Sequence, residues 1–268
     1  MRFGLLGTGH WAVETQGAAL AAHPSADLVG VWGRDPAKAK PVADRFGARA
    51  YPDVDALLAD VDAVSVAVPP DVQADLAERA ARAGRHLLLD KPLALTTTAA
   101  DAVVEAVDAA GVAALVFFTN RFRPEIEEFL ADLRRTGDWY ACRGVMHASI
   151  FQPGNPYGAS AWRRQHGGLW DIGPHALSIL LPVLGDVSEV TAVDGPRETV
   201  NVIARHADGA ASDLSLTLNA APNAVDRLIA MAAGGERRDP RDVHFGRTVV
   251  RILAAAEVAR RERRAVAL

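Results

Sequence analysis

A carboxylate and an imidazole lie four residues apart in the segment "GGLWDIGPHALSILL", residues 167–181. They belong to Asp171 and His175. Four residues make about one turn of an α-helix, so on a helix the two side chains share a face and can act on one group. A histidine titrates near neutral pH, with an ordinary pKa of about 6.5, and a carboxylate can orient an imidazole or a substrate hydroxyl. The spacing therefore makes the pair a candidate for acid–base chemistry.

Each member of this pair also has a purely structural explanation. Asp171 can serve as the N-cap of the following helix, because Pro174 would then occupy the first turn, where no intrahelical N–H is needed. His175 can be a core histidine that hydrogen-bonds to the backbone. The pair alone does not decide between catalysis and structure.

The first 118 residues alternate short apolar runs with stretches of helical periodicity. Continuous apolar strands separated by helices are typical of a parallel sheet covered on both faces, so we expect a doubly wound α/β domain. The expected strands are 2–7, 27–33, 62–68, 86–90 and 111–118, with a weaker one at 48–51, and 71–84 is an expected helix.

The first expected strand runs directly into "GTGHWA". Gly7 and Gly9 match the first two glycines of the dinucleotide-binding fingerprint, and Ala12 takes the third place. The first glycine allows a tight turn, and the second lets the backbone approach a pyrophosphate at the helix N-terminus. A plain connecting turn is the alternative, but the position after the first strand favours a Rossmann nucleotide site. Thr8, His10 and Trp11 are then expected beside the cofactor.

The end of the second expected strand, "GVWGRDPAKA" (30–39), bears on the choice between NAD and NADP. An acidic residue here would bind the ribose hydroxyls, whereas a small residue followed by arginine suits a 2'-phosphate. Asp35 precedes Pro36 and is explained as a helix N-cap. Gly33 and Arg34 then face the ribose, and we favour NADP. Arg34 can instead stack on the adenine or stay solvated.

The second half of the chain predicts an α+β domain with a mostly antiparallel open sheet. An amphipathic helix is expected at 124–137, and strands are expected at 140–150, 187–195, 198–206 and 211–219. The stretch 152–166 is rich in Pro, Gly and polar residues and predicts a loop over the substrate. Tyr157, Trp162 and Arg163 are its candidate substrate contacts, although either aromatic residue can equally anchor the loop.

Composition excludes several classes of protein. The 268 residues carry 29 Lys and Arg against 33 Asp and Glu, a formal charge of −4 that gives no bias toward nucleic acid or anionic membrane. Cys142 is the single cysteine, which allows no intrachain disulfide and favours a reducing cytoplasmic home. The N-terminal apolar run is too short for a signal peptide, no apolar stretch predicts a membrane span, and no metal-ligand spacing occurs.

Four segments together resemble the Gfo/Idh/MocA family of nicotinamide-dependent oxidoreductases. They are Asp90-Lys91-Pro92, where the family carries Glu-Lys-Pro, "NRFRP" (120–124), "AWRRQHGGLWDIGPHALSILL" (161–181) and the terminal segment 239–259. Gln73 departs from a histidine that is common in the family, and Ser178 departs from an aspartate. The chain is also short for the family, with the missing length between residue 219 and the terminal helix.

The resemblance implies a Rossmann domain at 1–118 and a substrate-binding and oligomerisation domain at 119–268. It implies hydride transfer between NAD(P) and a hydroxyl or carbonyl carbon of a sugar, cyclitol or similar small molecule. Lys91, Asp171 and His175 match the catalytic trio. Lys91 also lies at the carboxyl end of an expected strand, where open α/β sheets bind ligands, although by sequence alone a surface lysine at the start of a loop is an equal alternative. Expected cofactor contacts are Gly7, Thr8, Gly9, His10, Trp11, Gly33, Arg34, Pro69, Asp90 and Lys91; expected substrate contacts are Lys91, Tyr157, Trp162, Arg163 and His175.

Two other functional classes are compatible with the sequence. One is a non-catalytic NAD(P)-binding regulatory protein, and the other is a hydrolase or eliminase that uses NAD transiently. Retention of all three trio residues argues for the oxidoreductase. We also expect a homodimer or higher homo-oligomer, because an open sheet face that is mainly apolar on alternate residues needs a cover.

Overall fold

A computed structural model describes residues 1–220, 231–235, 243–262 and 264. The chain divides into two compact units, residues 1–220 and residues 221–268. The first unit contains two sheets and the candidate site. Among the described residues, no helix combines the length and the apolar character needed to cross a lipid bilayer.

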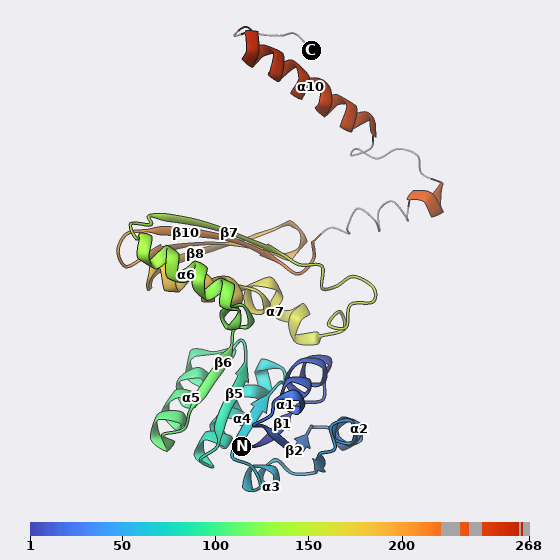
Figure 1. Ribbon diagram of the computed structural model, residues 1–268, viewed down its shortest axis with the longest axis vertical. Helices are drawn as coiled ribbons and strands as arrows, with labels where there is room; N and C mark the ends of the chain where they lie inside the picture. Colours follow the sequence, from blue (N-terminus) through green and yellow to red (C-terminus); the bar gives the residue numbers. More distant parts are fainter. Residues whose placement is uncertain (221–230, 236–242, 263, 265–268) are drawn as a thin grey trace. The chain divides into compact units, whose positions relative to one another are not determined.

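The first sheet is parallel and six-stranded, which confirms the doubly wound prediction (Figure 1). Its order is β3-β2-β1-β4-β5-β6. Neighbouring residues of β1 enter different cores, since Leu5 belongs to one cluster of buried residues and Leu6 to another. The strands are β1 (Arg2–Leu6), β2 (Asp27–Trp32), β3 (Arg49–Tyr51), β4 (Ala63–Val66), β5 (His86–Asp90) and β6 (Ala114–Phe117).

Three of the helices between these strands are capped by the side chains of Asp35, Asp53 and Thr96. Asp35 caps α2, with its Oδ1 accepting a hydrogen bond from the Ala37 N–H at 2.9 Å, as the sequence predicts. Thr96 caps α5 in the same way. The elements are the π-helix η1 (Ala12–Gly17), α1 (Ala18–Ala22), α2 (Pro36–Phe46), α3 (Val54–Ala59), α4 (Pro70–Arg82) and α5 (Thr97–Ala110).

The second sheet has the strand order β7-β10-β9-β8, with β7 parallel to β10 and the other pairs antiparallel. Its strands are β7 (Ala141–His147), β8 (Val187–Gly195), β9 (Thr199–His206) and β10 (Ala211–Thr217). The accompanying helices are η2 (Thr119–Phe122), α6 (Pro124–Thr136), α7 (Ala161–Asp171), α8 (Gly173–Leu184) and η3 (Pro196–Glu198). Figure 1 shows α6 and α7 on the same side of this sheet.

The other face of the second sheet is mostly polar. Arg143 pairs with Asp213 across β7 and β10, and Glu189 pairs with Arg205 across β8 and β9. Exposed apolar side chains such as Ile203 are scattered among these charges. The face is therefore not mainly apolar on alternate residues, which was the condition for expecting a partner subunit to cover it.

Two local expectations around the site are wrong. The loop predicted at 152–166 ends earlier, because α7 begins at Ala161. Asp171 is not the N-cap of the next helix: it is the last residue of α7, and α8 begins at Gly173 after the break at Ile172. The pair Asp171 and His175 therefore spans two consecutive helices rather than one turn of a single helix.

The second unit contains α10 (Val243–Glu262). The predicted terminal helix at 239–259 is helical from Val243 onward. Its first residues, 239–242, lie outside the described part of the chain, and so does most of the region between residue 220 and α10.

Candidate functional site

The loop after β1 has a backbone that needs its first glycine. Gly7 has a φ of +138°, and a Cβ built on it would lie 2.3 Å from the carbonyl oxygen of Ala67. Gly9, in contrast, has no atom within 4 Å of the place where a Cβ would stand. The chain thus makes a tight turn at Gly7, and the space beside the Gly9 backbone is open. A dinucleotide pyrophosphate can therefore approach the Gly9 backbone closely.

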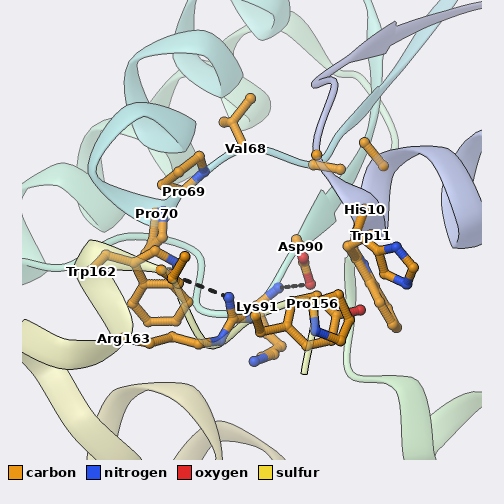
Figure 2. Close-up of a pocket in the computed structure, with 16 residues that line it drawn as sticks. His10, Trp11, Val68, Pro69, Pro70, Asp90, Lys91, Pro156, Trp162 and Arg163 are labelled. Atoms are coloured by element: carbon orange, nitrogen blue, oxygen red, sulfur yellow. Dashed lines mark hydrogen bonds between the residues drawn. The ribbon is translucent and has the colours of Figure 1, made fainter. Parts of the chain in front are cut away.

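This loop borders a cavity of about 230 Å³, which Figure 2 shows in close-up. His10 and Trp11 lie on one side of it, while Pro69, Pro70 and Trp162 lie on another. Asp90 and Lys91 line it from the carboxyl end of β5. Gly9, Pro69, Asp90 and Lys91 were all predicted cofactor contacts, so residues from three strand ends meet in one cavity.

A second cavity of about 200 Å³ shares five of these lining residues: Trp11, Asp90, Lys91, Tyr157 and Arg163. Asp171 and His175 line only this second cavity. The three trio residues therefore meet in a space that adjoins the dinucleotide loop. This is the arrangement expected when a substrate lies against a nicotinamide ring.

Asp171 is the electrostatic centre of the second cavity. Lys91 Nζ donates to Asp171 Oδ1 at 2.8 Å and to its main-chain oxygen at 2.7 Å. Arg163 Nε donates to the other carboxylate oxygen at 2.9 Å. With both oxygens bonded to cations and only 4% of the residue exposed, Asp171 holds Lys91 and Arg163. No hydrogen bond joins it to His175 among the described residues, so the expected orientation of the imidazole by Asp171 is not seen.

The pKa values in the cavity follow from burial and these neighbours. Burial alone would raise the pKa of Asp171, but the charges of Lys91 and Arg163 outweigh burial and lower it. Burial, reinforced by the Lys91 charge, lowers the pKa of His175 to about 4. The expectation of an ordinary histidine pKa near 6.5 is therefore wrong, because a desolvated imidazole beside an ammonium resists protonation. His175 is neutral at pH 7, and its buried Nδ1 has no hydrogen-bond partner in the described structure.

Asp90 behaves in the opposite way. Burial raises the pKa of its carboxyl to about 6, against the opposing effect of Lys91. Its Oδ1 accepts a hydrogen bond from the Lys91 N–H at 2.8 Å, drawn as a dashed line in Figure 2. The peptide bond between Lys91 and Pro92 is cis. The site thus contains a carboxyl that titrates just below neutral pH.

Arg163 lies between two aromatic rings. Its Cζ is 4.8 Å from the ring centroid of Tyr157 and 4.7 Å from that of Trp162. Tyr157 also makes an edge contact with His10 of the dinucleotide loop, with 5.6 Å between the ring centroids. All four of these residues line the first cavity. Tyr157 and Trp162 can therefore both anchor the loop and contact a bound molecule.

Four predicted cofactor residues do not line either cavity: Gly7 and Thr8 of the dinucleotide loop, and Gly33 and Arg34 after β2. A Cβ on Gly33 would stand 2.6 Å from Cγ2 of Thr8, so Gly33 lies against the dinucleotide loop. Arg34 follows it and is exposed. This position is compatible with the adenosine end of a dinucleotide whose other end lies in the cavity.

Sequence reasoning missed several residues that line the site. Thr119 lines the second cavity two residues after the end of β6, and the rule that placed Lys91 at a strand's carboxyl end could have found it. Ile150 and Ile172 also line this cavity, but apolar residues there carry no signal that separates them from the core. Gln73 was noted only as a departure from the family.

The parallel sheet, the glycine loop and the cavity at the carboxyl ends of the strands define a dinucleotide-binding Rossmann protein. Residues 1–118 match a family model described as "Oxidoreductase family, NAD-binding Rossmann fold". The chain belongs to the Gfo/Idh/MocA family of oxidoreductases, as the resemblance predicted.

Curated relatives and solved structures extend the likeness beyond residue 118. The chain is 34% identical to dTDP-3,4-didehydro-2,6-dideoxy-alpha-D-glucose 3-reductase of Streptomyces antibioticus over 189 residues, which are 69% of this chain and 57% of the relative. It is 36% identical to UDP-N-acetylglucosamine 3-dehydrogenase of Acidithiobacillus ferrooxidans over 128 residues, 47% of this chain and 40% of that one. The structure of GenD2 from gentamicin A biosynthesis, in complex with NAD, superposes with a TM-score of 0.74 and 26% identity, covering 83% of this chain and 67% of GenD2.

Proposed function

We propose that the protein transfers a hydride between a nicotinamide cofactor and a hydroxyl-bearing or carbonyl carbon of a sugar, cyclitol or similar small molecule. The observation that carries this proposal is the meeting of Lys91, Asp171 and His175 in a cavity that adjoins the glycine loop. The chain spans about half the length of the curated relatives named above. Its domains are proposed as a Rossmann domain at 1–118 and a substrate-binding domain at 119–268.

The cofactor, when bound, supplies the hydride acceptor or donor. Gly7, Thr8 and Gly9 would receive its pyrophosphate, whereas Trp11, Pro69 and Asp90 would border its nicotinamide end. The fit rests on the Cβ-free space at Gly9 and on the buried Trp11 Nε1, which has no partner among the described residues. The Gly33–Arg34 pair favours NADP over NAD at the adenosine end, because an exposed arginine after a glycine leaves room and charge for a 2'-phosphate.

In the oxidation direction, His175 would accept the proton of the substrate hydroxyl. Its lowered pKa keeps the imidazole neutral and able to accept a proton at neutral pH. Lys91 would hydrogen-bond the same oxygen and stabilise negative charge on it. Asp171 would hold the ammonium of Lys91 in place, with Arg163 sharing the carboxylate.

The lining of the second cavity suits a polyhydroxylated substrate. Lys91 and Arg163 supply hydrogen-bond donors, while Tyr157 and Trp11 supply flat apolar surfaces on which a sugar ring can lie. The two curated relatives act on nucleotide-linked sugars by their names. We therefore place this chain's substrate among sugars, free or nucleotide-linked.

We also propose a cytoplasmic protein that assembles as a homodimer or higher oligomer. The single cysteine supports a reducing compartment. Charged pairs lie on the outer sheet face, so an assembly through this face would bury polar as well as apolar side chains. Light scattering would decide it: a dimer at micromolar concentration supports the proposal, and a monomer refutes it.

A screen of cofactor and substrate tests the proposed activity. The purified protein is titrated with NADP(H) and NAD(H), then incubated with a panel that includes UDP-N-acetylglucosamine, inositol, D-xylose and a dTDP-linked deoxysugar, while nicotinamide absorbance is followed. Net cofactor reduction or oxidation supports the oxidoreductase. Tight cofactor binding without turnover indicates a regulatory protein, and substrate conversion without net cofactor change indicates a hydrolase or eliminase.

A further inference from the structure

The side chain of Gln73 is bound to the backbone around Lys91 through every polar atom it has. Its Nε2 lies 2.7 Å from the carbonyl oxygen of Asp90, 2.9 Å from that of Pro92 and 3.3 Å from that of Leu93. Its Oε1 accepts a hydrogen bond from the Asp90 N–H at 2.9 Å. Gln73 is 1% exposed, so these bonds are shielded from water.

The reason for this contact lies in the sheet. β4 pairs with β5 only as far as Val66 opposite Leu89, whereas β5 continues to Asp90. After Val66 the chain still bonds to β1, with the Ala67 N–H donating to the Leu6 oxygen, but its pairing with β5 has ended. The N–H and C=O of a strand residue point to the same side, so those of Asp90 face the place that β4 has left. The Gln73 carboxamide fills that place as a peptide group would.

We infer that Gln73 is a positioning residue for Lys91: its carboxamide fixes the backbone of residues 90–93 and thereby aims the lysine at Asp171 and the substrate. The Lys91 side chain reaches across to α7, where it bonds to Asp171. Gln73 fixes the backbone of this turn and Asp171 binds the Lys91 Nζ, so both ends of the lysine side chain are held. Gln73 itself lines neither cavity, so its contact with the site runs through the backbone of this turn.

A carboxamide is the side chain that this arrangement requires. Three main-chain carbonyl oxygens surround the Gln73 Nε2, and the Asp90 N–H points at the Gln73 Oε1. The side chain must therefore carry a donor and an acceptor on the same carbon. A glutamate would face the three carbonyl oxygens with negative charge. A methionine of similar length would leave the N–H and C=O of Asp90 buried without partners. Either substitution removes hydrogen bonds that fix the backbone of residues 90–93.

The inference rests on the proposed function only in the role that it gives Lys91. Its test measures the lysine itself and needs no substrate. The chain has three lysines, Lys38, Lys40 and Lys91. The Lys91 side chain is 10% exposed, whereas that of Lys40 is 71% exposed and Lys38 is also exposed. The two exposed lysines thus serve as internal references within the same molecule.

The experiment compares acetylation rates by N-hydroxysuccinimidyl acetate in the full chain, followed lysine by lysine with peptide mass spectrometry. In Gln73→Met we expect the Lys91 rate, relative to Lys40, to rise roughly tenfold or more, because the turn loses several buried hydrogen bonds. Gln73→Glu, which keeps the size and solubility of the side chain, should show the same rise and secures the test if the methionine variant folds poorly.

Gln16→Met is the matched control. Gln16 is a second buried glutamine of the same sheet domain. Its Oε1 accepts a hydrogen bond from Ser65, and among the described residues it makes no hydrogen bond to residues 90–93. It should leave the relative Lys91 rate unchanged even if it lowers the melting temperature. A Lys91 rate that stays at the parent level in both Gln73 variants overturns the inference, and so does an equal rise in Gln16→Met. An inactive parent protein would refute the proposed function but leave this comparison intact.

Discussion

Lys91 and Asp171 are 80 residues apart in the chain, yet the Lys91 Nζ lies 2.8 Å from one carboxylate oxygen of Asp171 and 2.7 Å from its main-chain oxygen. The lysine comes from the end of β5 and the aspartate from the end of α7. Their side chains are 10% and 6% exposed. A buried ion pair thus joins the two sheet-containing parts of residues 1–220 at the cavity where chemistry is proposed.

Replacing Asp171 by asparagine should destabilise the protein strongly. The change leaves Lys91 and Arg163 buried without their shared anion, and breaking a buried pair from one side costs about 3–5 kcal/mol. Chemical denaturation measures the free energy of unfolding. Asp213→Asn is the matched control, because its pair with Arg143 is exposed and should contribute less than about 1 kcal/mol. Equal losses in the two variants would contradict the electrostatic role given to Asp171.

The Asp90 carboxyl should make binding of oxidised cofactor depend on pH. With a pKa of about 6, it is mainly neutral below that pH and charged above it. The oxidised nicotinamide ring is cationic and the reduced ring is not. The ratio of affinities for oxidised over reduced cofactor should therefore rise roughly three- to tenfold from about pH 5 to about pH 7. Calorimetric titration of both forms measures it, and Asp90→Asn should make the ratio flat. A rise that persists in Asp90→Asn assigns the effect to another group.

Arg34 should determine cofactor preference. If it contacts the 2'-phosphate, NADP(H) binds more tightly than NAD(H), and Arg34→Ala removes most of the difference, roughly ten- to a hundredfold in affinity. Calorimetry again gives the constants. Arg49→Ala removes the same charge from the exposed guanidinium that stacks on Tyr51, and it should leave the preference intact. If the parent protein binds NAD more tightly than NADP, the NADP assignment is wrong.

His175→Asn should lower turnover by roughly 10²–10⁴-fold with little change in cofactor affinity, because a polar group remains but the proton acceptor is lost. The parent's oxidation rate should fall as the pH drops through about 4, where the imidazole becomes protonated, and should show no step from this residue at 6.5. His147→Asn, on the polar outer face where its ring bonds to Ser215, should keep full turnover. A well-folded His175→Asn protein with parental turnover would leave His175 a structural residue.

Much of the fold was predictable because apolar runs and capping residues are local signals. The run 86–90 became β5, and Asp35 followed by Pro36 marked the start of α2. Local signals failed at residues 167–175, where helical periodicity continues but Gly167 has a non-helical φ of 62° and the helix breaks at Ile172. Spacing alone could not show that two helices share the segment.

The candidate residues of the site could also be predicted from the sequence, but the contacts between them could not. The position of Lys91 after a strand and the Asp171–His175 spacing made all three candidates, and the resemblance to the family selected them as a trio. The ion pair between Asp171 and Lys91 could not be predicted, since it joins residues far apart in the chain. The low pKa of His175 depends on burial and on Lys91, and the role of Gln73 depends on where β4 ends. These are properties of the packed structure.

Transfer of deuterium from the cofactor tests the central claim most directly. The protein is incubated with nicotinamide cofactor deuterated at the transferable position of C4 and with the ketosugar or aldose that the screen identifies, and the product is analysed by mass spectrometry. The account predicts one deuterium in each product molecule and one cofactor oxidised for each product formed. Product that forms without deuterium, or cofactor that binds with neither oxidation nor product across the whole panel, would contradict it.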